Sequence, residues 1–88
     1  MLEFLTRPDE DHHMDDHMRL TVEILREEDG RFLAEISALP GVMAYGATAD
    51  EATEKAKALA LRVLAERIEH REPLPKELEP LFSIHRVA

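Results

Sequence analysis

Residues 20–37 read LTVEILREEDGRFLAEIS, and this stretch decides the fold. Apolar and polar residues alternate on both sides of a central Asp29-Gly30 step, which is the pattern of two half-buried strands. An Asp-Gly step between such runs is a strong hairpin signal, because glycine adopts the positive φ that a tight turn requires. The stretch therefore predicts that a strand over residues 18–27 pairs antiparallel with a strand over residues 31–37.

A second turn and a third strand follow the hairpin. Leu39-Pro40-Gly41 predicts a turn, since Pro40 fixes φ at one corner and Gly41 is free to adopt the next. Residues 42–45 then predict a short strand that ends at Gly46. The first half of the chain is thus expected to form a three-stranded antiparallel meander.

The next segment has the features of a helix from Thr48 to about His70. Thr48-Ala49-Asp50-Glu51 is a capping box, in which the Thr48 hydroxyl accepts from the Glu51 amide and the Glu51 carboxylate reaches back to the Thr48 amide. Neither Gly nor Pro interrupts the following residues. One stripe of this helix is predicted to pack on the sheet, and it comprises Ala49, Ala52, Ala56, Leu59, Ala60 and Val63.

A second apolar patch lies nearly opposite that stripe. It could consist of ordinary scattered surface residues, or it could be a surface for self-association, because a domain this small gains stability from oligomerising. The patch comprises Ala58, Leu61, Ala65 and Ile68.

The remaining residues predict a linker and a last strand. Glu72-Pro73-Leu74-Pro75 is expected to be extended, since a residue before proline avoids the α region. Residues 81–87 (LFSIHRV) alternate like a strand, and the long connection lets that strand return parallel to the first one. The expected fold is α+β: a three-stranded antiparallel meander, one crossing helix and a short final strand (βββαβ).

The composition limits the possible functions. The 88 residues include 19 acidic and 11 basic side chains, for a net charge of −8, and no cysteine. Disulfides, thiolate zinc sites and cysteine nucleophiles are excluded, and an acidic chain is not expected to bind nucleic acid by itself. No apolar run is long enough to span a membrane, and no secretory signal is evident, so we expect a cytoplasmic protein.

The acidic charge is concentrated in residues 1–17, which carry a net −5. We expect this segment to be a flexible arm and residues 18–88 to form a single domain. His13 and His17 have the i, i+4 spacing of a helical metal pair, with His12 beside them. A solvated tail is the simpler interpretation, and a weak metal site is the alternative, because two imidazoles without a third ligand bind metal weakly.

Three motifs in order resemble the HicB antitoxin family of prokaryotic toxin–antitoxin systems. They are Glu28-Asp29-Gly30-Arg31-Phe32, Leu39-Pro40-Gly41 and the Gly46-x-Thr48-x-x-Glu51-Ala52 start of an Ala-rich helix. The resemblance covers roughly residues 20–75. It implies a truncated ribonuclease H-like fold and a partner of the HicA type, a small basic RNA-cleaving toxin whose active site the antitoxin blocks.

Two features of the chain depart from the HicB pattern. HicB proteins usually continue into a DNA-binding module, whereas only 18 residues follow His70, and Val42 stands where many members have cysteine. The alternative to an antitoxin is a stand-alone oligomeric domain of the same fold that has a structural or ligand-binding role. For the antitoxin hypothesis, the candidate partner-binding residues are Glu23, Glu27, Glu28, Asp29 and Tyr45.

We expect no enzymatic activity and no cofactor. Ribonuclease H-type nucleases need four carboxylates around two metal ions, but the first strand offers Glu23 alone and the last strand no acid. Glu51 is explained by the helix cap, and no phosphate loop, catalytic triad or H-E-x-x-H motif is present.

Overall fold

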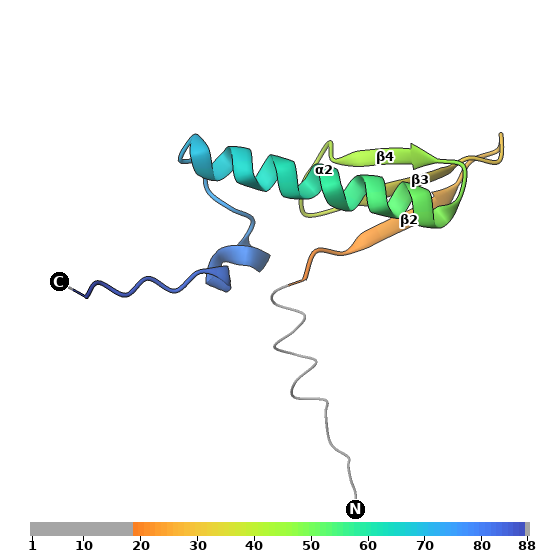
Figure 1. Ribbon diagram of the computed structural model, residues 1–88. Helices are drawn as coiled ribbons and strands as arrows, with labels where there is room; N and C mark the ends of the chain where they lie inside the picture. Colours follow the sequence, from red (N-terminus) through yellow and green to blue (C-terminus); the bar gives the residue numbers. More distant parts are fainter. Residues whose placement is uncertain (1–18, 88) are drawn as a thin grey trace, which may run out of the picture. The chain divides into compact units, whose positions relative to one another are not determined.

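The computed structural model describes residues 19–87 of the chain (Figure 1). Leu20–Pro75 forms one compact unit, and the described residues outside it, Arg19 and residues 76–87, belong to a second unit. The first unit coincides with residues 20–75, the range that the resemblance described above covers.

The Leu20–Pro75 unit contains a three-stranded antiparallel sheet of order β2-β3-β4. The strands are β2 (Val22–Arg26), β3 (Phe32–Ile36) and β4 (Met43–Gly46). The predicted meander is confirmed. The third strand starts one residue later than predicted, because the Val42 amide donates to the Leu39 carbonyl at 2.9 Å and closes the turn.

The two turns are built as the sequence indicates. In the hairpin, the Gly30 amide donates to the Glu27 carbonyl at 3.0 Å, and Gly30 has a φ of 92°. Gly41 in the second turn has a φ of 89°. Both values lie in the left-handed region that a residue with a Cβ rarely adopts, which accounts for glycine at these positions.

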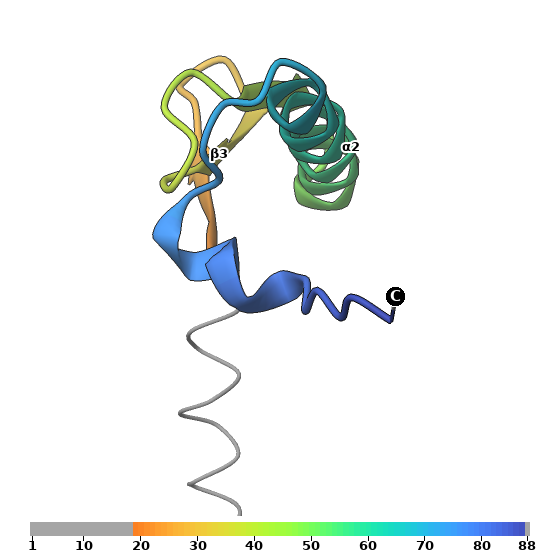
Figure 2. The same ribbon diagram turned by 90° about the vertical axis from the view of Figure 1, so that its left-hand side faces the viewer.

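Helix α2 (Ala49–Glu69) follows β4 and packs on one face of the sheet (Figures 1 and 2). Thr48 is its N-cap, and the Thr48 hydroxyl accepts from the Glu51 amide at 3.0 Å, as predicted. The return half of the capping box was predicted wrongly. The Glu51 carboxylate accepts from the amide of Ala47, one residue before the N-cap, instead of from the amide of Thr48.

The core lies between α2 and the β3–β4 side of the sheet. On the helix, Ala52, Ala56, Ala60 and Leu64 are buried, and they face the buried Ala34 and Ile36 of β3. The other predicted stripe residues, Ala49, Leu59 and Val63, are only half-buried, and Leu64 was missed.

Gly46 sets how closely β4 approaches the helix. A Cβ built on Gly46 would lie 2.5 Å from the Ala52 nitrogen and 3.0 Å from the Ala52 Cα. Contact this close leaves no room for a side chain. Glycine at this position of the motif is therefore a packing requirement, independent of any binding role.

The helix ends in a Schellman motif. The Arg71 amide donates to the Ile68 carbonyl at 3.1 Å, and the Glu72 amide donates to the Arg67 carbonyl at 2.8 Å. Arg71 occupies the position after the C-cap with a φ of 60°, where glycine is the usual residue. None of the helices among residues 19–87 is long and apolar enough to cross a membrane.

The second unit corrects one prediction. Within this unit, Lys76–Leu81 forms a 3₁₀-helix, η1, and residues 82–87 form no strand. The α+β arrangement of three strands and a helix is confirmed, but the final strand predicted over residues 81–87 is absent from the sheet. A strand needs a hydrogen-bonded neighbour, and an alternating pattern in the sequence does not supply one.

Candidate functional site

The sheet has two faces of different character. Side chains at even-numbered positions of the strands point toward α2, and those at odd-numbered positions point away from it, as the strand register requires. Within the Leu20–Pro75 unit, no other element covers the side that faces away from the helix (Figure 2). We call this side the outer face; it consists of Glu23, Leu25, Leu33, Glu35, Met43 and Tyr45.

An apolar row crosses the outer face. Leu25 lies directly opposite Leu33, and Leu33 lies directly opposite Tyr45, so the three side chains are neighbours across the three strands. Leu25 is 52% exposed and Tyr45 is 41% exposed. Single exposed apolar side chains are common, but a contiguous row on an uncovered sheet face is typical of a protein-binding surface.

A pair of carboxylates lies beside the apolar row. Glu23 lies directly opposite Glu35, with Met43 next to Glu35 on β4. Like charges at directly opposite positions of a sheet destabilise it. No ion pair to either carboxylate occurs among residues 19–87. Within the part of the chain that the structure describes, the outer face thus presents two adjacent carboxylates without an ion-pair partner, next to exposed apolar surface.

The hairpin end of the outer face carries a fixed cation. The Arg31 guanidinium lies 4.2 Å from the centre of the Tyr45 ring, a distance at which a cation is attracted to the ring face. The carboxylate of Asp29 holds Arg31 in place, accepting from its amide at 3.0 Å and from its Nε at 2.8 Å. These bonds, the amide first, lower the pKa of Asp29.

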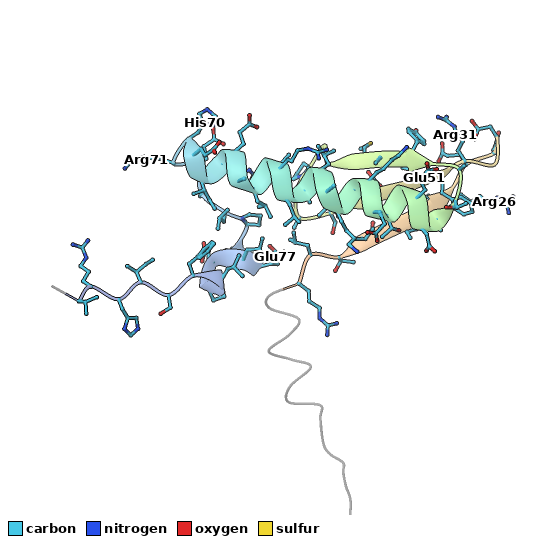
Figure 3. The ribbon with its side chains drawn as sticks, viewed as in Figure 1. Arg26, Arg31, Glu51, His70, Arg71 and Glu77 are labelled. Carbon is cyan, nitrogen blue, oxygen red and sulfur yellow. The ribbon has the colours of Figure 1, made fainter. Side chains whose placement is uncertain are left out.

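The predicted partner-binding residues therefore separate into three groups. Glu23 and Tyr45 lie together on the outer face. Glu27 and Glu28 lie at the hairpin tip, where they line a shallow hollow with Arg26 and Asp29. Figure 3 labels Arg26 and Arg31 at this end of the hairpin. Asp29 is bonded to Arg31 of the same hairpin, so its charge is already compensated.

Four residues of the outer face were not identified as candidate binding residues from the sequence, namely Leu25, Leu33, Glu35 and Met43. The signal that could have identified them is the hairpin register. Once the turn is placed at residues 27–31, position 26 pairs with 32, and position 23 must then pair with 35. The acid pair follows from that register without any tertiary information.

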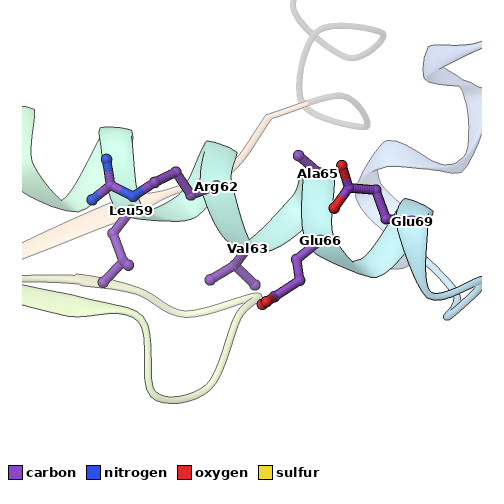
Figure 4. A pocket seen from close by; sticks show the side chains of 6 residues that line it. All are labelled: Leu59, Arg62, Val63, Ala65, Glu66 and Glu69. Atoms are coloured by element: carbon purple, nitrogen blue, oxygen red, sulfur yellow. The ribbon is translucent and has the colours of Figure 1, made fainter.

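The second apolar patch of α2 is exposed. Ala58, Leu61, Ala65 and Ile68 all lie on the helix surface. Next to this patch, an open hollow that Ala65 also lines combines Arg62 with Glu66 and Glu69 around Leu59 and Val63 (Figure 4). No polar side chain is buried among residues 19–87, so this hollow has no enclosed polar group to orient a small ligand.

Histidine and carboxylate side chains are the remaining candidates for metal or catalytic chemistry. Among residues 19–87, no group of three or more His, Asp or Glu side chains could hold a metal ion. The metal site considered for His12, His13 and His17 lies outside the described residues. His70 is bonded through Nδ1 to the Glu66 carbonyl at 2.9 Å in the helix end, and His85 is exposed.

Comparison with known proteins gives one clear relative. No protein-family model matches the chain, and no solved structure matches it. The UPF0150 protein Ta0767 of Thermoplasma acidophilum is 33% identical over 69 residues, which span 77% of this chain and 99% of the relative. Identity at this level over nearly the whole relative establishes common membership: the chain belongs to the UPF0150 family.

Proposed function

We propose that this chain is a HicB-like protein-binding module that neutralises a small basic ribonuclease of the HicA type by covering its active site. The three ordered motifs support this proposal, and membership of the UPF0150 family is compatible with it. The main support comes from the outer face. There, an exposed apolar row lies beside Glu23 and Glu35, two neighbouring carboxylates that have no ion-pair partner among residues 19–87.

The chemistry of this surface fits a basic protein partner. Leu25, Leu33 and Tyr45 offer apolar area whose burial favours association. Glu23 and Glu35 offer carboxylate oxygens from two adjacent strands, so one Lys or Arg of the partner can lie between them and remove their mutual repulsion. An RNA-cleaving protein must present such cations, because it binds a polyanion.

Arg31 restricts which partners fit. Its charge lies over Tyr45 at the hairpin end of the outer face, whereas the acid pair lies toward the other end of β2. Asp29 compensates the charge of Arg31, so the hairpin end of the face is close to neutral and the other end is negative. A partner with a cation over the acid pair and an aromatic or apolar group against Arg31 and Tyr45 docks in one orientation, which favours specific recognition.

Co-expression tests the proposal. The product of a short basic reading frame adjacent to the gene of this chain is expressed with and without the chain, and growth and complex formation are measured. We expect growth arrest by the basic protein alone, rescue by this chain, and co-purification of the two. Absence of both rescue and complex would contradict the antitoxin role and favour a stand-alone domain.

Two matched double variants test whether the partner binds at the outer face. Glu23→Gln/Glu35→Gln removes two negative charges from the acid pair, and Glu66→Gln/Glu69→Gln removes two from the exposed side of α2. We expect the first variant to weaken calorimetrically measured binding by at least about 10-fold, and the second by less than about 3-fold. Equal losses would show that net charge alone drives binding.

A further inference from the structure

The sheet has a free edge at β2. Strand β2 pairs only with β3 within the described sheet, so one row of its backbone groups has no strand partner (Figure 1). The Glu27 amide donates to the Arg31 carbonyl, so odd-numbered residues of β2 direct their backbone groups at β3. The amide and carbonyl groups of Val22 and Ile24 therefore point outward from the edge, where an added strand could bind them.

An apolar groove runs along this edge on the helix side. Helix α2 packs mainly against β3 and β4 and much less against β2, so Ile24 on the helix-facing side of β2 is 45% exposed. The groove is lined almost entirely by carbon atoms, with Lys57 as the one charged residue. Its lining comprises Leu20, Val22, Ile36, Lys57, Ala60 and Leu61.

A matching strand is present in the same chain. Residues 81–87 alternate, with Phe82 and Ile84 on one side and Ser83 and His85 on the other. Phe82 is 62% exposed and Ile84 is 80% exposed, and these residues have no strand partner. The segment contains no acidic side chain, so it brings no like charge to the β2 edge beside Glu23.

We propose that this chain self-associates by strand addition, in which residues 81–87 of one copy pair with the free edge of β2 in a second copy. Phe82 and Ile84 then enter the groove beside Leu61, and the backbone groups of Val22 and Ile24 acquire hydrogen-bond partners. Two copies can exchange these segments about a two-fold axis, so that both sheets gain a fourth strand and the β2 strand of each copy is paired on both sides.

This arrangement accounts for two separate observations. Residues 81–87 have the alternation of a strand, yet they form no strand in the single chain. The exposed Leu61, which a solitary domain does not need, becomes a wall of an occupied groove. The outer face, which the proposed ribonuclease partner uses, stays open, because strand addition occupies the edge and the helix side of the sheet.

The oligomeric state of the full chain is the first test, measured by size-exclusion chromatography with light scattering. We expect a dimer or a multiple of it. Ile84→Asp, which puts a charge into the groove, should raise the dimer dissociation constant at least about 100-fold, because each dimer carries the substitution twice. His85→Asp, on the opposite side of the segment, is the matched control and should leave the dimer intact. A monomeric wild-type chain, or equal effects of the two variants, would overturn the proposal.

Engineered cysteines test which residues meet, since the chain has no cysteine of its own. Leu61→Cys chains are mixed with Ile84→Cys chains under oxidising conditions and separated on a non-reducing gel. A covalent dimer that forms in the mixture, and not with His85→Cys in place of Ile84→Cys, is the expected result. A crosslink formed only within single chains that carry both Leu61→Cys and Ile84→Cys would show pairing inside one chain and overturn exchange between copies.

Discussion

Replacing Glu35 with glutamine is expected to make the isolated protein more stable. Glu35 lies directly opposite Glu23 in a hydrogen-bonded pair of positions, for which the two Cα atoms are about 5.5 Å apart. Two carboxylates about 6 Å apart repel each other by about 0.7 kcal/mol in a water-like dielectric. Glutamine keeps the length and the hydrogen-bonding capacity of the side chain and removes this repulsion. The free energy of unfolding should therefore rise by about 0.5 to 1 kcal/mol.

Urea denaturation followed by circular dichroism measures this effect. For a domain of this size, the gain corresponds to an increase in Tm of about 2–8 °C. The gain should shrink as salt is raised to about 1 M, where the screening length falls to about 3 Å. Glu23→Gln should give a similar gain, and the double variant should give little more than either single one, because one charge already removes the repulsion.

Two results would refute this reasoning. If Glu35→Gln left the unfolding midpoint unchanged or lowered it, the acid pair would not be a source of repulsion. If the gains of the two single substitutions added in full, the two carboxylates would act independently of each other. A stabilised variant that also binds its partner less well would indicate that the acid pair is retained for binding at a cost in stability.

Three further predictions concern the fold. Gly46→Ala should lower the free energy of unfolding by about 2 kcal/mol or more, measured by urea denaturation, because its methyl group would overlap the Ala52 backbone. Arg71→Gly should raise the Tm through a stability gain of about 1 kcal/mol, since glycine adopts the positive φ of this position without strain. The Ala47 amide, and then Lys55, lower the pKa of Glu51 below its ordinary value of 4.5. The stability that this carboxylate contributes is therefore present above about pH 4.5, and it is lost as the pH falls through the lowered pKa. Unfolding curves at several pH values should therefore show a weaker acid dependence for Glu51→Gln than for the wild type.

Most of the fold could be predicted because its signals are local. The Asp29-Gly30 turn lies between two alternating runs, and the Thr48 cap precedes a helix without Gly or Pro, so neighbouring residues alone determine these elements. The prediction that failed, a strand over residues 81–87, depends on residues far away in the sequence. Residues 81–87 have the pattern of a strand, but whether a strand forms depends on which sheet edge is available, and no local pattern records that.

In the core and the candidate site too, features set by neighbouring residues were predicted and features set by distant partners were not. Leu64 was missed because the position of the sheet decides which side of α2 is buried. That buried side is rotated away from the centre of the apolar stripe that the sequence shows. Glu23 and Tyr45 were identified as candidate partner-binding residues, but their apolar and acidic neighbours on the outer face were not. Those neighbours come from pairing across strands, and the hairpin register was the information needed to find them.

The most direct test of the binding surface is a chemical-shift map of the ¹⁵N-labelled full chain, titrated with the unlabelled basic protein encoded beside it. The largest amide shifts should occur at Leu25, Leu33, Glu35 and Tyr45, with little change at Glu66 on the exposed side of α2. Shifts concentrated on α2, with the four outer-face residues unchanged, would contradict the assignment of the outer face as the partner-binding surface.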